Sequence, residues 1–369
     1  MDVASSSRPR VSVVMAVYNG EPFLKETLRS VLGQTWADFE FVVIDDGSTD
    51  ASGEIVRSFE DSRIRLIENG TNRGLSPSLN RGLREARGEF IARIDADDLA
   101  LPTRLERQVE YLDAHPAIAL VGSGFREIRN GKPTGPKLYH PTDHVWLRWS
   151  LMFYCPFLHS AVMWRRRPVA EQVGPYDEDF AYAMDWEYWG RIGGHLGIAN
   201  LKEVLANYRL GPHSMTETHP HVAREVSAAR RASIASVFGE EGAERWAPEG
   251  PRLFPVIDGW SPSTTPDEIR ESVQTIERLQ AAFEARMGLE GSALEEFRES
   301  MPNWIAQRLL YRARKAHRAG HRRLGTTLFR EARSVHPRLL ATVDFARYVG
   351  ARVLGPRLEN WPPKTGRWS

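Results

Sequence analysis

The sequence predicts an α/β fold, in which a mostly parallel sheet carries helices on both faces and a helical C-terminal region follows. Two apolar runs, Val11–Val17 and Glu40–Ile44, are typical of strands that are covered on both faces. Segments with helical spacing of apolar residues separate these runs from each other and from later strand-like segments. Such alternation indicates parallel strands joined by helical crossovers.

The elements are expected in a fixed order. The strand at 11–17 precedes a helix that begins near Pro22, because the first helical turn tolerates proline, and whose apolar positions are Phe23, Leu24, Leu28, Val31 and Leu32. After the strand at 40–44, further strands are expected at Arg63–Ile67, Glu89–Ile94 and Ala117–Gly122, and helices at Ser76–Arg87 and Pro102–Ala114. Residues 126–220 are irregular and rich in aromatic side chains. The pattern becomes helical from about His221, with a proline-rich interruption before Asp267.

Polar residues follow three of the predicted strands at the point where each strand ends. The ligand crevice of a parallel sheet lies beyond the carboxyl ends of its strands, so we expect these side chains to share one rim. They are Tyr18 and Asn19, then Asp45 and Asp46, then Asp95, Asp97 and Asp98.

The segment Asp95-Ala96-Asp97-Asp98 carries carboxylates two positions apart where the chain turns. Such carboxylates can converge on one hard divalent cation and leave coordination positions for diphosphate oxygens. Asp98, shortly before Pro102, is also well placed to cap the next helix. Both interpretations stay open.

The segment Asp45-Asp46-Gly47-Ser48-Thr49-Asp50 is rich in turn residues. A turn with a helix N-cap explains its last four positions. It explains Asp45 less well, because this carboxylate directly follows a buried strand, where burial without a partner costs free energy. A carboxylate there could accept a hydrogen bond from a nucleobase N–H.

Three further residues are candidates. Asp185 is expected to share a helix face with Trp189. An apolar aromatic wall raises the pKa of a neighbouring carboxyl and suits it to act as a general base. The alternative is that Asp185 is the N-cap of the helix. Arg73 lies in a loop where it could clamp a phosphate or be a solvated surface arginine. His213 lies in a loop that could approach a metal, although a lone histidine is usually not a ligand.

Several sequence signals are missing. The chain has no G-x-x-x-x-G-K-[ST] loop, no G-x-G-x-x-G turn after the first strand and no H-E-x-x-H, which disfavours P-loop NTPases, dinucleotide dehydrogenases and HExxH metalloproteases.

The single cysteine, Cys155, excludes an intramolecular disulfide and a cysteine-based metal cluster. The first apolar run is too short for a signal peptide, and no run reaches the ~18–20 residues of a membrane-spanning helix. We therefore expect a cytoplasmic protein.

The order of these motifs, continued by Met184-Asp185-Trp186-Glu187-Tyr188-Trp189, resembles family 2 of the glycosyltransferases. The resemblance covers roughly residues 10–215, and it includes Pro156–Ser160, Arg165-Arg166 and Tyr208–Leu210. It implies an inverting, metal-dependent enzyme of GT-A (Rossmann-like) fold that uses a nucleotide sugar. It also implies a domain at 1–220, with a nucleotide-sugar-binding half at 1–125 and an acceptor half at 126–220, and a mainly helical region at 221–369.

The resemblance implies roles for residues that bind the nucleotide. Tyr18 resembles the residue that stacks on the base, with the backbone of Ala16 alongside it. Asp45 is similar to the aspartate that reads the base N–H, and Arg73 resembles the arginine near the base and the diphosphate. Asp95 matches the first aspartate of the family's D-x-D, which is directed toward the ribose.

The resemblance also implies a metal site and a base. Asp97 matches the second D-x-D aspartate, on Mg²⁺ or Mn²⁺, with Asp98 as a competing ligand. His213 resembles a loop histidine that completes the metal site. Asp185 matches the catalytic base, and Met184 stands where the family has a glutamate, which leaves that glutamate's acceptor contact unassigned.

The implied reaction is a single displacement. An acceptor hydroxyl loses its proton to Asp185 and attacks the anomeric carbon opposite the leaving diphosphate, whose charge the metal and Arg73 offset. We expect a UDP-sugar donor, a glycan or lipid-linked glycan acceptor, and a hexosyl or related transfer in surface polysaccharide biosynthesis. The alternatives are an inactive nucleotide-sugar-binding or scaffold protein, and a sugar-1-phosphate nucleotidyltransferase, which would need a glycine-rich loop that is missing after the first strand.

Charge is divided unevenly along the chain. Residues 305–369 hold 15 Lys and Arg against 3 Asp and Glu, a charge of +12, whereas residues 1–304 carry −11, so the net charge of +1 describes neither part. The basic tail could be a helical appendage that packs on the acidic body. It could instead lie on an anionic membrane leaflet, where each basic residue contributes ~1 kcal/mol. Nucleic-acid binding is not expected, because nothing else in the chain supports it.

Overall fold

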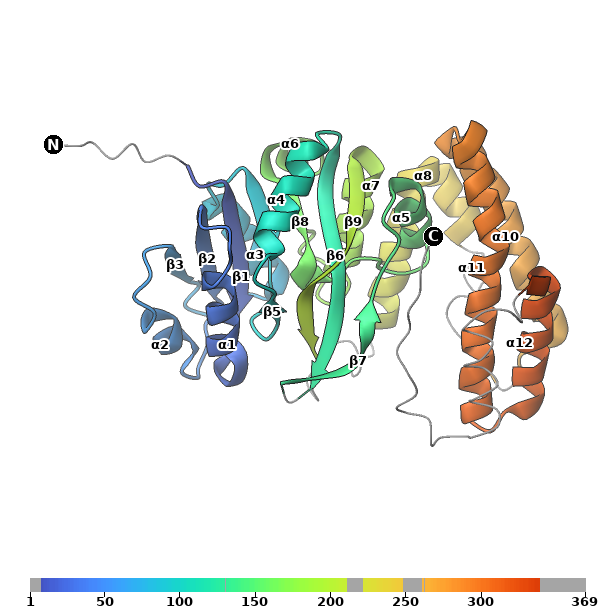
Figure 1. Cartoon of the computed structure of the whole chain (residues 1–369), viewed down its shortest axis with the longest axis horizontal. Helices are drawn as coiled ribbons and strands as arrows, with labels where there is room; N and C mark the ends of the chain where they lie inside the picture. Colours follow the sequence, from blue (N-terminus) through green and yellow to red (C-terminus); the bar gives the residue numbers. More distant parts are fainter. Residues whose placement is uncertain (1–7, 130, 211–221, 248–260, 262, 339–369) are drawn as a thin grey trace. The chain divides into compact units, whose positions relative to one another are not determined.

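The computed structural model describes residues 8–129, 131–210, 222–247, 261 and 263–338. The chain divides into two compact units, of which the first extends to Ser236 and the second begins at Val237. Figure 1 shows a sheet with flanking helices in the first unit (blue to green) and a group of helices in the second (orange to red).

The first unit is built on one mixed sheet. Its strands are β1 (Val11–Val17), β2 (Phe39–Asp45), β3 (Ile64–Glu68), β4 (Phe90–Arg93), β5 (Leu99–Ala100), β6 (Ile118–Arg129), β7 (Lys132–Leu138), β8 (Met163–Arg165) and β9 (Gly197–Arg209). They follow the order β3-β2-β1-β4-β8-β6-β9-β5, with β7 paired to β6. The four strands β3, β2, β1 and β4 are parallel neighbours, and β6 is parallel to β9, while β8 runs antiparallel between β4 and β6. The predicted α/β fold with a mostly parallel sheet is confirmed.

Helices cover both faces of this sheet. They are α1 (Glu21–Leu32), α2 (Ser52–Arg57), α3 (Leu75–Glu85), α4 (Arg104–Ala114), α5 (His144–Leu151), the 3-10 turn η1 (His159–Ala161), α6 (Arg166–Gln172) and α7 (Met184–His195). Successive side chains of a strand point to opposite faces, so Val13 and Met15 of β1 pack in a core with α1 and α4, whereas Val14 and Ala16 pack in a second core with α3, α5 and α7. Burial on both faces explains why β1 is a continuous apolar run.

The predicted element boundaries differ most from the structure at α3 and β6. Helix α3 ends at Glu85, short of the predicted Arg87, because Ala86 is extended and the chain at Gly88 passes close to β1. A Cβ on Gly88 would lie 2.5 Å from the amide nitrogen of Ser12. Strand β6 continues to Arg129, well beyond the predicted end, because its pairing with β7 and β9 continues there. Tertiary pairing, and not the local apolar pattern, decides where β6 ends.

The remaining described helices are α8 (Val222–Trp246), α10 (Pro266–Met287), α11 (Gly291–Arg318) and α12 (Arg322–Val335). Helix α8 is broken at Gly239, where φ is 76°. In the second unit α12 packs against α10 and α11. Helix α10 begins with a capping box, in which Thr265 accepts from the Glu268 amide and the Glu268 carboxylate accepts from the Thr265 amide. None of the helices in the described residues combines the length and the apolar composition that crossing a membrane requires.

Candidate active site

The loops after β1, β2, β3 and β4 lie at one edge of the sheet, because these strands are parallel neighbours. Tyr18 follows β1 directly and is 50% exposed, whereas most large aromatic side chains among the described residues are at least partly buried. The β1–β4 ladder ends at Val14 and does not extend to Ala16, further along β1. The exposed ring of Tyr18 therefore follows the part of β1, including Ala16, that is not paired with β4.

Side chains tie the loop after β1 to the loop after β2. The Asn19 side chain accepts a hydrogen bond from the Thr49 amide at 2.8 Å, and the Glu21 amide donates to Asp50 Oδ2 at 3.0 Å. Asn19 itself has φ 52°, in the left-handed region that asparagine adopts more readily than most residues. These contacts hold the backbone on both sides of Tyr18.

Asp46 organises the loop after β3. Its carboxylate accepts from Asn69 Nδ2 at 2.7 Å and from the amides of Arg73 and Gly74 at 2.9 Å each. Hydrogen bonds to an ionised group are stronger than neutral ones, so this carboxylate fixes the backbone of the loop. The side chain of Arg73 remains exposed at the same edge.

Asp45 ends β2 and is buried, being 5% exposed. Its Oδ1 accepts from the Ser48 amide at 2.9 Å. No hydrogen bond to its Oδ2 is found among the described residues, so one acceptor oxygen remains. A ligand N–H could use this oxygen.

Asp95 follows β4 and is held by groups beneath it. Its Oδ2 accepts from Ser160 Oγ at 2.8 Å and pairs with the guanidinium of the fully buried Arg93. Burial alone would raise the pKa of the Asp95 carboxyl, but the charge of Arg93 and the hydrogen bonds outweigh burial and lower the pKa to about 2. Asp95 is therefore ionised at neutral pH.

The next two carboxylates differ from each other. Asp97 keeps an exposed side chain, although desolvation by the surrounding chain and repulsion from Asp95 raise the pKa of its carboxyl to about 6. Asp98 is fully buried and accepts from the Arg209 amide at 2.7 Å, which joins this turn to the end of β9. Asp98 is not the cap of α4, because Thr103 occupies that position.

Asp185 lies in the first turn of α7, inside the helix, so it is not the N-cap, which is Ala183. Its Oδ1 accepts from the Trp186 amide at 2.7 Å, and Cys155 Sγ lies 3.9 Å from its Oδ2. Burial raises the pKa of the Asp185 carboxyl to about 6, although the Trp186 hydrogen bond and the charge of Arg93 act in the opposite direction. A carboxyl in this range can gain and lose a proton near neutral pH.

Arg93 is the cation that these carboxylates share. Its charge lowers the pKa of Asp95, Asp97 and Asp185, and the charge of Asp95 raises the pKa of Asp185. Charge effects of this kind fall off with distance, so the end of β4 lies near the start of α7. The predicted base thus lies within range of the charges of Arg93 and Asp95.

Glu225 of α8 holds the segment that precedes α7. Its Oε2 accepts from the amides of Ala181, Tyr182 and Ala183 at 3.1, 2.6 and 3.0 Å. Three amides directed at one carboxylate fix the backbone just ahead of Asp185. No local sequence pattern connects Glu225 with this segment.

Comparison with known proteins identifies the family. The sequence profile described as "Glycosyl transferase family 2" matches residues 12–173. The O-antigen biosynthesis glycosyltransferase WbnJ of Escherichia coli is 31% identical over 210 residues, which cover 54% of this chain and 79% of WbnJ. The chain belongs to glycosyl transferase family 2.

This family 2 glycosyltransferase is similar to a second E. coli protein, whose name states its donor and acceptor. WfgD, a UDP-Glc:alpha-D-GlcNAc-diphosphoundecaprenol beta-1,3-glucosyltransferase, is 29% identical over 208 residues, 56% of this chain and 79% of WfgD. Among solved structures, that of S. aureus TarS 1–349 in complex with UDP-GlcNAc superposes with a TM-score of 0.57 at 20% identity, over 88% of this chain and 92% of that one. This likeness supports the GT-A fold. Membership of this family sets aside the sugar-1-phosphate nucleotidyltransferase alternative.

The residues that the sequence singled out in this glycosyltransferase lie mostly at the edge just described. They are Ala16, Tyr18, Asp45, Arg73, Asp95, Asp97 and, at the start of α7, Asp185. His213 lies outside the described residues. Sequence reasoning missed Arg93 and Glu225, and it gave Ser160, a residue of the Pro156–Ser160 segment, no contact with Asp95. A usable signal existed for Arg93, because an arginine that ends an otherwise apolar strand needs an anionic partner when it is buried.

Proposed function

We propose that this family 2 glycosyltransferase is an inverting enzyme that transfers a sugar from a UDP-sugar to a hydroxyl of a glycan or lipid-linked glycan, in surface polysaccharide biosynthesis. The observation that carries the proposal is the carboxyl of Asp185, whose burial raises its pKa to about 6 and on which the charges of Arg93 and Asp95 act. A general base works best when its pKa lies near the operating pH.

Asp185 is proposed to act through its Oδ2. The Trp186 amide occupies Oδ1 and fixes the carboxylate, while the neighbouring Cys155 thiol stays protonated, since burial raises its pKa well above the usual value. An acceptor hydroxyl at Oδ2 gives up its proton as its oxygen attacks the anomeric carbon. Attack opposite the leaving diphosphate inverts the configuration and needs no covalent nucleophile.

The donor is proposed to bind at the loops after β1, β2 and β3. Tyr18 offers an exposed face for the base, Asp45 an acceptor oxygen for its N–H, and Arg73 a guanidinium for the diphosphate. Asp95 and the backbone of Ala16 complete the proposed nucleotide contacts. The name of WfgD, which specifies UDP-glucose and a diphosphoundecaprenol-linked acceptor, supports the donor and acceptor classes, and the name of WbnJ supports polysaccharide biosynthesis.

A divalent cation, Mg²⁺ or Mn²⁺, is part of this proposal. The chemistry of the donor set fits, because Asp97 presents an exposed carboxylate and hard cations prefer oxygen ligands. Asp98 fits less well, since it is buried and bonded to Arg209. Within the described residues no group of three or more His, Cys, Asp or Glu side chains is arranged for a metal, which is compatible with a cation held by Asp97 and diphosphate oxygens, with His213 as a further ligand. When bound, the cation would offset charge on the departing diphosphate.

The base assignment is tested with Asp185→Asn. We expect nucleotide binding to be retained and kcat to fall roughly 10²–10⁴-fold, because amide nitrogen cannot accept the proton. The matched control is Asp179→Asn, which makes the same change at an exposed position shortly before α7. Near-normal turnover of Asp185→Asn in a panel of UDP-sugars and acceptors would exclude Asp185 as the base.

The lipid-linked acceptor class supports a further proposal, that basic residues of 305–369 contact an anionic membrane surface. Within the described part of this segment, α12 buries Leu324, Leu328 and Ala332 on one side. Four arginines of the same helix are exposed: Arg322, Arg323, Arg330 and Arg333. A helix with one buried apolar side and exposed arginines elsewhere presents positive charge to its surroundings.

A further inference from the structure

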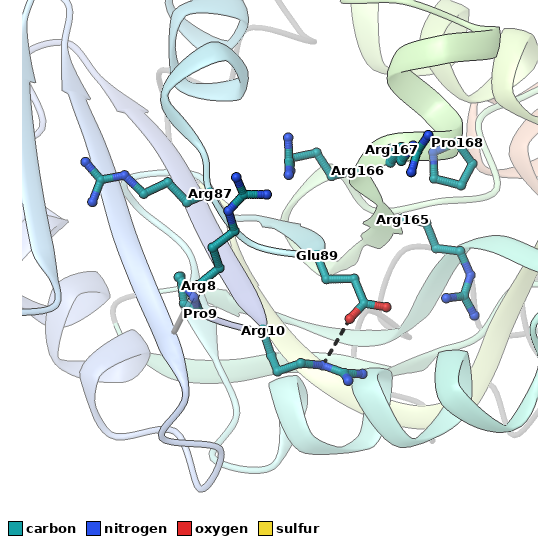
Figure 2. Close-up of a pocket in the computed structure, with 9 residues that line it drawn as sticks. All are labelled: Arg8, Pro9, Arg10, Arg87, Glu89, Arg165, Arg166, Arg167 and Pro168. Atoms are coloured by element: carbon teal, nitrogen blue, oxygen red, sulfur yellow. Dashed lines mark ion pairs between the residues drawn. The ribbon is translucent and has the colours of Figure 1, made fainter. Parts of the chain in front are cut away.

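A second cluster of charge lies at the edge of the sheet opposite the candidate active site. A pocket of about 420 Å³ opens there, shown in Figure 2. It is lined by Arg8, Pro9, Arg10, Arg87, Glu89, Arg165, Arg166, Arg167 and Pro168. Six arginines thus share one small pocket with a single carboxylate.

The topology of the sheet assembles this pocket. Arg10 precedes β1, and β8 runs antiparallel to β4, so that Arg165 at the end of β8 lies opposite Phe90 at the start of β4. Tyr18 follows the other end of β1. At ~3.3 Å per residue, β1 separates the pocket from Tyr18 by roughly 25 Å, so the two sites are distinct.

Two of the arginines are held in place by neutral groups. Arg166 Nε donates to the carbonyl oxygen of Gly88 at 2.6 Å, and Arg165 donates to the carbonyl oxygens of Ile118 at 3.0 Å and Leu112 at 2.5 Å. A carbonyl partner fixes the position of a guanidinium but does not cancel its charge. The wall of the pocket is therefore both ordered and cationic.

Ion pairs neutralise only part of this charge. Arg10 pairs with Glu89 at 3.4 Å and with an aspartate outside the pocket, and Arg167 pairs with a glutamate of its own helix. The exposed side chains of Arg8 and Arg87 form no ion pair with a described residue. The remaining excess of positive charge suits a ligand with more than one negative charge.

We propose that this pocket is a binding site for a phosphate-bearing anion, separate from the donor site. In Figure 2 the side chains of Arg8 and Arg166 extend toward the same space from different segments of the chain. Converging guanidinium groups can hold phosphate oxygens through paired hydrogen bonds, and a pocket of this volume accommodates a phosphate together with its substituent. The phosphate belongs either to a free mono- or diphosphate or to a lipid headgroup.

The site is tested by calorimetric titration of the full chain with inorganic pyrophosphate and, separately, with monomeric dihexanoylphosphatidylglycerol. Both titrations contain EDTA, so that metal-dependent binding at the donor site does not contribute. We expect Arg8→Gln/Arg166→Gln to weaken binding at least tenfold. The matched control is Arg84→Gln, which removes an exposed positive charge of the nearby α3 that does not line the pocket.

The outcomes separate the two sources of phosphate. Binding of pyrophosphate assigns the pocket to free anions, and binding of the lipid alone assigns it to a headgroup. If the wild-type chain binds neither probe, or if Arg84→Gln weakens binding as much as the double variant, the proposal is overturned. Should the double variant fold poorly through loss of the Arg166–Gly88 bond, Arg8→Gln alone is the test, since Arg8 makes no such contact.

Discussion

At the scale of single residues, one buried cation acts differently on two carboxyls. Arg93 pairs directly with Asp95, and this contact outweighs burial, so the pKa of Asp95 falls to about 2. Asp185 makes no such pair, so burial prevails and its pKa rises to about 6. Two carboxyls with opposite shifts in one cluster can take different roles, one as a fixed anion and one as a proton acceptor.

Asp185→Asn is expected to stabilise the fold at neutral pH. Folding raises the pKa of Asp185 from 3.8 to about 6, so the wild-type chain pays for an ionised, partly buried carboxylate above pH 6. As the pH falls through 6, the folded chain takes up the proton and this penalty shrinks, until it is gone below the unfolded pKa. The Trp186 amide and the charge of Arg93 lower the pKa of Asp185, the charge of Asp95 raises it, and Cys155 Sγ lies 3.9 Å from its Oδ2.

Urea unfolding at pH 7 and pH 5 measures this effect. We expect Asp185→Asn to gain on the order of 1–3 kcal/mol over the wild type at pH 7, and clearly less at pH 5. Asp179→Asn, the exposed control, is expected to show no such gain at either pH. A gain of Asp185→Asn that is equal at both pH values would contradict the raised pKa.

At the scale of elements, the loops that are proposed to bind the donor are held by carboxylates that the ligand is not expected to touch. Asp50 and Glu21 join the loop after β2 to the start of α1, and Asp46 holds the loop after β3. Glu225 does the same for the segment ahead of α7. Parallel strands supply the edge, and these hydrogen bonds give each loop a defined position on it.

Asp46→Ala is expected to release the loop that carries Arg73. Asn69 Nδ2 and the amides of Arg73 and Gly74 would lose their hydrogen bonds to Asp46, and each hydrogen bond to a charged group contributes about 1.5–3 kcal/mol. The Gly74 amide keeps Asn72 Oδ1 as an acceptor and Asn69 Nδ2 keeps Ser78 Oγ, whereas the Arg73 amide loses the acceptor it has here. We expect faster hydrogen exchange across 69–74 and at least tenfold weaker binding of UDP. Asp61→Ala, which removes a carboxylate at the far end of β3, is the control and should leave UDP binding unchanged.

At the scale of the whole molecule, charge separates the chain into an acidic part and a basic part. A cut before Ile305, at the start of the basic tail, would fall inside α11, where Ile305 is buried. Truncation there would remove core residues together with the charge. Surface substitutions on α12 are the better probe of membrane contact.

Replacing Arg322, Arg323, Arg330 and Arg333 with glutamine is expected to lower binding to vesicles rich in phosphatidylglycerol at least tenfold, because each basic residue near such a surface contributes ~1 kcal/mol. Co-sedimentation with the vesicles measures the fraction of protein bound. Lysine at the same four positions preserves the charge and should preserve binding, and vesicles of phosphatidylcholine should bind neither form. Binding that is equal in the glutamine and lysine forms would remove the membrane proposal.

Local sequence patterns predicted much of the first unit. The alternation of apolar runs gave β1, α1, β2 and their neighbours, because burial on both faces leaves a signature in consecutive residues. The ends of α3 and β6 could not be predicted, since the close approach at Gly88 and the pairing of β6 with β9 depend on distant segments. The role of Glu225 could not be predicted for the same reason, because this residue of α8 accepts a hydrogen bond from the Ala183 amide, which is distant in the sequence.

The sequence by itself determined the α/β class, the family and the aspartates at the strand ends, since these depend on residue type and order along the chain. Only the tertiary structure decided which of those aspartates stay accessible. Asp98 and Asp97 are neighbours in sequence, yet packing against β9 buries the first and leaves the second exposed. The pKa of Asp185 likewise depends on burial and on Arg93, a residue far away in the sequence. Solvation and charge act through space, so no local pattern encodes them.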